Sequence, residues 1–241
     1  MYCVDNYIAN PTHRIKVMVI GVGGTGSFLL TELVSLSQTL VALGRKPLKI
    51  TVYDDDKVEA HNVFKQKFFE SDIGEYKAEV LVNRINRAYG SDVEFFVEKL
   101  YSIDDNTNII ISSVDNVNSR KAIDKSIKQN IGKNRNYDKL YYWIDCGNSK
   151  DFGQIILSSY IEDKRKDRLP SLIDLNPYIK EDVTAPSCSM RAALLQQSFM
   201  INKFTGVLAI QMLASMLLEF NISYSQVYFN LNKMNIKTNK I

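Results

Sequence analysis

The sequence predicts an α/β protein of the Rossmann-like type, with a mostly parallel sheet, flanking helices and antiparallel strands towards the C-terminus. The first observation is a β-rich segment, 14–20, that runs directly into the glycine-rich turn 21–26. The second is a run of apolar residues at helical spacing, from Leu29 to Leu43. The third is the continued alternation of short β-rich and longer helical segments, which indicates parallel strands joined by crossover helices.

Turn residues divide the rest of the chain into its elements. Gly44 and Pro47 end the first helix. We expect strands at 48–53, 93–97, 108–112, 140–145 and 154–159, the last of them antiparallel, and helices at 77–87 and 119–129. Residues 161–189 are rich in Asp, Pro and Ser and predict an irregular surface segment. After it we expect one long or broken apolar helix at 191–220 and terminal strands at 226–231 and 234–237.

The composition excludes several classes of protein. With 241 residues, 45% of them hydrophobic and 24% charged, the chain can bury a sizeable core and is neither disordered nor collagen-like. Its net charge is only +3 and its basic residues form no long block, so we expect no nucleic-acid or membrane partner. There is no apolar signal-peptide core, and the uncharged run 204–218 is shorter than a membrane span. We therefore expect a cytoplasmic protein.

The glycine-rich turn predicts a nucleotide site. Its glycines stand between a strand and a helix, where a dinucleotide-binding fingerprint lies: Gly21, Gly23, Gly24 and Gly26. Glycine lets the backbone approach phosphate closely, and the N–H groups at the start of the helix receive its charge. Asp54 ends the second strand and can accept hydrogen bonds from ribose hydroxyls. The alternatives are a tight turn without a ligand and an ordinary acid at the end of a strand.

Further polar residues follow at fixed spacing. They are Asp54-x-Asp56-x-Val58 with Asn62 and Lys65-Gln66, then Gly74-x-x-Lys77, then Asp115-Asn116 with Arg120. In this order they resemble the motifs of the ThiF/MoeB/HesA adenylyltransferase superfamily, which includes the ubiquitin-activating enzymes, over about residues 15–220. The segments Asn10-Pro-Thr-His-Arg14 and Pro186-Ser-Cys188-Ser189 are similar to the ThiF-like subgroup found in PRTRC gene cassettes.

The resemblance implies one adenylation domain over residues 1–241, with an N-terminal tail at 1–14 and a crossover-loop-like segment at 161–190. It implies ATP and Mg²⁺ as cofactors and the C-terminal carboxylate of a small ubiquitin-like protein as the substrate. It also implies a conjugating-enzyme-like protein as a further partner and a homodimer as the assembly.

The resemblance assigns roles that also make chemical sense, because the site must neutralise phosphate charge. Lys77 is the residue for direct phosphate contact, and Asn62 can donate to a phosphate oxygen. Asp115 can hold magnesium, which prefers a carboxylate together with water and phosphate oxygens. Arg120 either orients Asp115 or contacts phosphate, and Asn116 fixes the loop. Two further nucleotide-binding positions are Asp56 and Gln66.

The sequence departs from the family pattern at Lys65, where the family has arginine. Lysine keeps the charge but loses the planar fork for bidentate phosphate contact. Either activity is reduced, or a neighbouring subunit supplies an arginine. A second departure is the short N-terminus, in which Arg14 alone stands near the first strand.

The three cysteines differ in what they suggest. There is no Cys-x-x-Cys pair, so we expect neither a disulfide framework nor a structural zinc site. Cys188 stands just before the long apolar helix and near Arg191, where a thiolate that accepts the acyl group would be stabilised. The alternative for Cys188 is a small buried residue in a turn. Cys146 ends an expected core strand and is interpreted as structural, whereas Cys3 is uninformative.

Three functions remain open at this point. The first is ATP-dependent adenylation, with or without a thioester on Cys188. The second is a catalytically weakened ATP-binding scaffold, which Lys65 makes plausible. The third is an NAD-linked oxidoreductase, for which neither His13 nor His61 supplies a convincing acid–base group.

Overall fold

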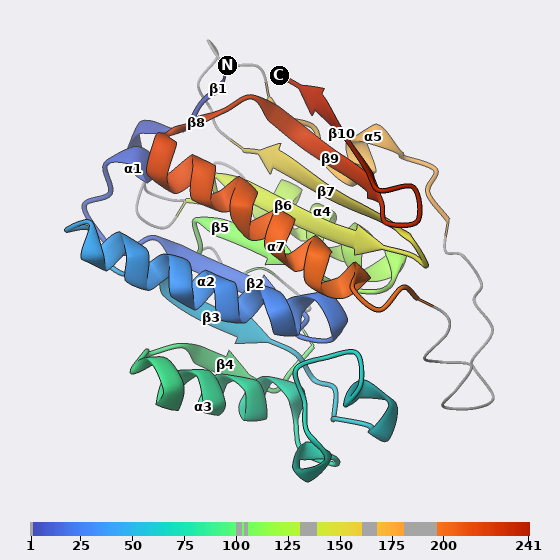
Figure 1. The fold of residues 1–241 in the computed structure, drawn as a ribbon. Coiled ribbons are helices and arrows are strands. Elements are labelled where there is room, and N and C mark those ends of the chain that lie inside the picture. The colour runs from blue at the N-terminus through green and yellow to red at the C-terminus, as the bar shows by residue number, and fades with distance from the viewer. Residues whose placement is uncertain (1, 100–102, 104–105, 131–138, 161–167, 181–196) are drawn as a thin grey trace.

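The structure is a computed structural model that describes residues 2–99, 103, 106–130, 139–160, 168–180 and 197–241. It contains an eight-stranded sheet of order β10-β9-β7-β6-β5-β2-β3-β4 (Figure 1). The strands are β2 (Lys16–Ile20), β3 (Lys49–Tyr53), β4 (Glu94–Phe96), β5 (Ile109–Ser112), β6 (Tyr142–Asn148), β7 (Phe152–Ser159), β9 (Tyr224–Asn230) and β10 (Asn235–Lys240). Strands β6, β5, β2, β3 and β4 are parallel, and β7, β9 and β10 are antiparallel. The predicted fold class is confirmed.

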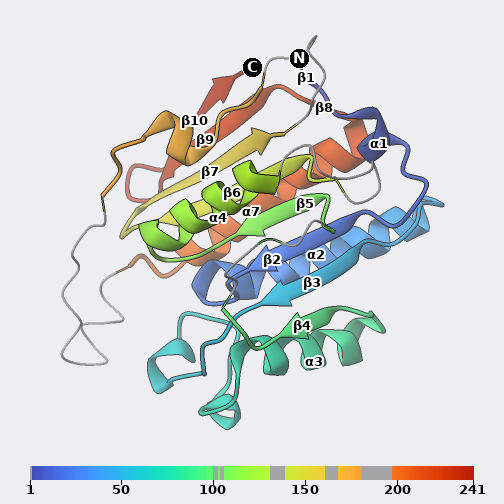
Figure 2. The same cartoon turned by 180° about the vertical axis from the view of Figure 1, so that it is seen from behind.

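Helices cover both faces of this sheet. They are α1 (Asn6–Ala9), α2 (Gly24–Ala42), α3 (Lys77–Tyr89), α4 (Val117–Asn130), α5 (Leu172–Leu175) and α7 (Ile201–Ala214), with short turns η1 (Ala60–Asn62), η2 (Glu70–Asp72) and η4 (Ser215–Glu219). Helices α2 and α7 lie side by side on one face, and α4 lies on the other (Figure 2). A small second sheet pairs β1 (Tyr2–Cys3) with β8 (Asn221–Ile222).

Strand β2 shows how the sequence places the core on both faces. Successive side chains of a strand point to opposite faces. Val17 and Val19 belong to the large apolar cluster beneath α2 and α7, whereas Met18 and Ile20 belong to the smaller cluster on the α4 side. A strand buried on both faces reads as a continuous apolar run, which is typical of a parallel sheet.

Two sequence expectations differ from the structure at their boundaries. We expected one long or broken apolar helix at 191–220; residues 191–196 lie outside the described residues, residues 197–200 are not helical, and α7 begins at Ile201 and continues as a wider helical turn to Glu219. The expected N-terminal tail also contains structure, because β1 and α1 form and Ile8 is fully buried. Apolar periodicity alone did not mark either boundary.

The combined helix Ile201–Glu219 is also long and apolar enough, by these two criteria alone, to cross a membrane, with a mean hydropathy of 1.4. This differs from the sequence estimate, which counted only the run 204–218. Half of the helix is buried inside the protein, and it contacts α2, β6 and β7. These contacts are those of a core helix.

Candidate functional site

The candidate site lies at the carboxyl ends of the parallel strands, where α2 also begins. At this edge the backbone of Gly21 has φ of +85°, a conformation that favours glycine. A Cβ at Gly26 would come within 2.1 Å of the Gly21 carbonyl oxygen, so the turn is too tight for any side chain there. A tight turn at the start of a helix is where backbone N–H groups can receive an anion, and Gly23 and Gly24 of this turn are partly exposed.

Asp54 connects the end of β3 to the glycine-rich turn. Its carboxylate accepts hydrogen bonds from the Val22 N–H at 2.7 Å and the Asp56 N–H at 2.9 Å. Burial raises the pKa of Asp54, while these two hydrogen bonds and the nearby Lys77 oppose that rise. Each carboxylate oxygen has further acceptor capacity, so Asp54 can hold the turn and still accept a ribose hydroxyl.

Lys77 is the first residue of α3, and its side chain is only 9% exposed. Its ammonium lies 2.8 Å from a carboxylate oxygen of Asp56, whose side chain is 67% exposed. The sequence assigned both residues to nucleotide binding, and the structure brings them into direct contact. An ammonium paired with an exposed carboxylate can exchange that partner for a phosphate at little desolvation cost.

The segment between β3 and α3 contributes three more of the predicted residues. Asn62 is buried, and its side-chain oxygen accepts a hydrogen bond from the Glu59 N–H at 2.8 Å. Its carbonyl oxygen also accepts hydrogen bonds from the N–H groups of Lys65 and Gln66. Asn62 therefore organises the turn that carries these two side chains.

Within that turn, the side-chain oxygen of Gln66 is buried and has no hydrogen-bond partner among the described residues. It lies 3.9 Å from the position that a Cβ on Gly23 would occupy, so it faces the glycine-rich turn. Partial burial lowers the pKa of Lys65. A buried acceptor without a partner is costly unless a ligand or water donates to it.

Asp115 and Asn116 follow β5 at the same edge of the sheet. Asp115 is exposed and accepts a hydrogen bond from the Asn116 amide at 3.1 Å. The Asn116 side-chain oxygen accepts the Ser119 N–H at 2.7 Å, as a helix-capping side chain does. Asn116 therefore fixes the loop, and Asp115 offers a free face of its carboxylate to solvent.

Arg120 binds a residue that the sequence analysis did not consider. No hydrogen bond joins it to Asp115 within the described part of the chain; instead its Nε donates to both oxygens of the fully buried Asp145, at 3.2 and 3.1 Å. The sequence analysis missed Asp145, because one acid inside an apolar strand gives no motif. An acid within the run Trp143-Ile144-Asp145-Cys146 was the available signal, since a buried carboxylate needs a partner.

The cysteines separate by environment. Cys146 is buried, and desolvation, together with the nearby charge of Asp145, raises the pKa of its thiol, which disfavours the reactive thiolate. Cys3 is exposed. Cys188 and Arg191 lie outside the described residues.

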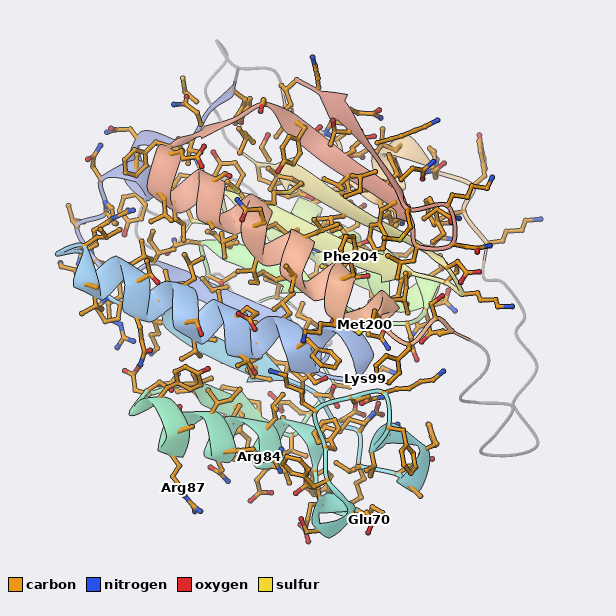
Figure 3. The ribbon with its side chains drawn as sticks, viewed as in Figure 1. Glu70, Arg84, Arg87, Lys99, Met200 and Phe204 are labelled. Atoms are coloured by element: carbon orange, nitrogen blue, oxygen red, sulfur yellow. The ribbon has the colours of Figure 1, made fainter. Side chains whose placement is uncertain are left out.

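The sequence analysis did not identify two lysine side chains that lie near the site. Lys99 follows β4, and Figure 3 places it, with Met200, at the end of the sheet where α2 begins. Lys67 donates its backbone N–H to Ser27 of α2 and holds its ammonium over the Phe28 ring, 5.6 Å from the centroid. Within the ranges that the structure describes, no group of three acidic, histidine or cysteine side chains could hold a metal ion by itself.

The arrangement agrees with a comparison against protein families, in which the ThiF family matches residues 10–241. The chain belongs to the ThiF family. A comparison with curated protein sequences gives no match. The ThiF fold is also seen in solved structures at low sequence identity.

Three such structures illustrate the likeness. PaaA is 16% identical with a TM-score of 0.63, covering 94% of this chain and 64% of PaaA. E. coli MccB with ATP is 15% identical with a TM-score of 0.62, covering 98% of this chain and 65% of MccB. The microcin C7 biosynthetic enzyme MccB in complex with N-formylated MccA is 16% identical with a TM-score of 0.64, covering 94% and 64%. This ThiF-family chain thus spans less than two thirds of the length of these proteins.

Proposed function

We propose that this chain uses ATP to adenylate a carboxylate at the C-terminus of a small protein or peptide. The observation that carries the proposal is the meeting of Lys77, Asp54 and the glycine-rich turn at one edge of the sheet. These groups supply a cation, a ribose acceptor and backbone N–H donors, which are the parts that a nucleoside triphosphate needs. Membership of the ThiF family and the fold shared with MccB, whose structures include one with ATP, support the same reaction.

In this reaction the substrate carboxylate oxygen attacks the α-phosphorus of ATP, the bond to the β-phosphate oxygen breaks, and pyrophosphate leaves. The glycine-rich turn and Lys77 stabilise negative charge on the phosphates, and Asp54 orients the ribose. Lys65 and Asn62 lie on the segment that flanks them. Asp115 fits a magnesium ion, since one exposed carboxylate suffices when phosphates and water complete the shell, and that ion neutralises phosphate charge when bound.

We propose a small ubiquitin-like protein with a free C-terminus as the substrate and a conjugating-enzyme-like protein as a further partner. The motif resemblance supports this choice. Solved structures of MccB include complexes with MccA, so a short peptide is the alternative substrate for this chain. We further propose a homodimer, a cytoplasmic location and, for the second half-reaction, a thioester on Cys188.

The deciding experiment is ATP–pyrophosphate exchange measured with a ubiquitin-like protein and, separately, with a short peptide, each with a free C-terminus. Exchange that depends on the free carboxylate supports adenylation. Thermal unfolding in ATP with magnesium, compared with NAD, separates adenylation from the oxidoreductase alternative, because only the bound nucleotide raises the unfolding temperature.

A second candidate function is an ATP-binding scaffold without turnover, favoured by lysine at position 65. A scaffold would show stabilisation by ATP but no exchange with either substrate. The Cys188→Ala variant then tests the thioester separately. It should retain exchange and lose a reductant-sensitive adduct, whereas Cys146→Ala should keep the adduct and lose only stability.

A further inference from the structure

Asp145 forms a buried network beneath the loop that carries Asp115. Its side chain is fully buried, and it accepts a hydrogen bond from the Ser112 hydroxyl at 2.7 Å. The Trp143 indole donates to the same hydroxyl at 2.9 Å. The Asp145 carboxylate of β6 is therefore held by Ser112 of the adjacent strand β5 and by Arg120 of α4.

Arg120 extends this network to the loop itself. Its Nη2 donates to the carbonyl oxygen of Val114 at 2.6 Å and to that of Cys146 at 3.0 Å. Val114 immediately precedes Asp115. The Arg120 guanidinium therefore links the buried Asp145 carboxylate to the backbone of Val114, the residue before Asp115.

The energetics of such a pair favour a role in geometry. A buried ion pair contributes little net stability, and well-packed apolar residues often replace it without loss. Such a pair fixes the geometry of its partners, because the planar guanidinium holds several acceptors at fixed angles. Asp145 is fully buried, and the hydrogen bonds of the Arg120 side chain go to Asp145 and to two backbone carbonyl oxygens.

We propose that Asp145 is a positioning residue, which orients Arg120 and thereby holds the Val114 carbonyl and the Asp115 carboxylate in place for magnesium-bound nucleotide. This inference rests on the proposed use of ATP with magnesium. Asp115 itself is exposed and has only the Asn116 amide as a side-chain hydrogen-bond partner in the described part of the chain. The position of Asp115 is therefore set through its backbone, by the hydrogen bond from Arg120 to the Val114 carbonyl.

The test compares Asp145→Asn with a matched control, Asp124→Asn. Asp124 lies on α4, as Arg120 does, is 5% exposed, and is paired with Lys128 at 2.7 Å and with the Ser171 hydroxyl at 2.8 Å. Both substitutions remove one buried, ion-paired carboxylate charge while keeping the side-chain volume. Only the first acts on the loop that carries Asp115.

The measurement is ATP affinity by calorimetry, with magnesium and with EDTA, together with the magnesium dependence of pyrophosphate exchange. In Asp145→Asn, Arg120 loses its carboxylate partner, and Asp115 is then held less firmly. Magnesium-dependent ATP binding should weaken, and the magnesium requirement should rise about 10-fold. ATP binding in EDTA should stay unchanged. Asp124→Asn should match the wild type in both. If Asp145→Asn does not fold, Arg120→Lys serves instead, since it keeps the charge but loses the fork that reaches Val114.

Two results overturn the inference. One is a folded Asp145→Asn or Arg120→Lys protein with wild-type magnesium dependence. The other is equal weakening of ATP binding with and without magnesium, which would mean a general structural effect. A wild-type protein that binds no ATP would contradict the proposed function and this inference with it, whereas the first two results leave the proposed function intact.

Discussion

The contact between Lys77 and Asp56 allows activity and stability to be separated by one substitution. We predict that Lys77→Met lowers ATP–pyrophosphate exchange strongly and changes the free energy of unfolding little. Methionine fills nearly the same volume, so the buried stem, 9% exposed, keeps its packing. The charge that is lost pairs with Asp56, whose side chain is 67% exposed and stays hydrated without it.

The two magnitudes differ widely. An ion pair with a solvent-exposed partner is worth about 0–1 kcal/mol of stability. A donor aimed at charge that develops in the transition state is worth about 3–4 kcal/mol, or roughly 100- to 1000-fold in rate. The exchange rate should therefore fall by about two to three orders of magnitude. The midpoint of urea unfolding should move little.

The assay is exchange under saturating substrate, paired with urea unfolding followed by circular dichroism. Lys57→Met is the matched control, because Lys57 is exposed, lies near the start of the same segment and holds its ammonium 4.7 Å from the Tyr76 ring centroid. The control should exchange like the wild type. A folded Lys77→Met protein that retains exchange within about threefold would refute the role assigned to Lys77.

Three further predictions concern neighbouring residues. Asp115→Ala should abolish magnesium-dependent exchange and leave the circular dichroism spectrum unchanged, because its side chain is exposed; retained exchange would contradict the assignment. Lys65→Arg should preserve or increase exchange by restoring a bidentate fork, and a severe loss would count against that reasoning. Burial raises the pKa of Asp54, so its contribution to stability is present at low pH and is lost as the pH rises through its folded-state pKa. Asp54→Asn should therefore unfold at neutral pH no earlier than the wild type while binding ATP more weakly, as thermal unfolding and calorimetry would show.

Much of the fold could be predicted from local signals. The strand β2, the glycine-rich turn and the start of α2 follow from β-branched residues, glycine and apolar spacing, all of which are properties of neighbouring residues. The sequence motifs also indicated Asp54, Lys77 and Asp115 as residues of the nucleotide site. In the structure Asp54 follows β3 and Asp115 follows β5, at the carboxyl ends of parallel strands, and Lys77 begins α3.

The partners within that edge could not be predicted in the same way. Arg120 pairs with Asp145 rather than Asp115, and this choice depends on how α4 packs against β6. An apolar run likewise shows where burial is allowed and not where the backbone turns, so it did not mark the turn at Met200 that precedes α7. Long-range pairing of this kind has no local pattern in the sequence.

The direction of the helices gives the site a property that no side chain carries. Helices α2, α3, α4 and α7 all begin at the edge where the parallel strands end (Figure 1). The amino end of each helix has a partial positive charge from its aligned peptide groups. Peptide dipoles neither gain nor lose protons, so this attraction for an anion is the same across the pH range in which the fold persists. The formal net charge is only +3, so in the proposed ATP site the backbone would supply part of the attraction for the phosphates.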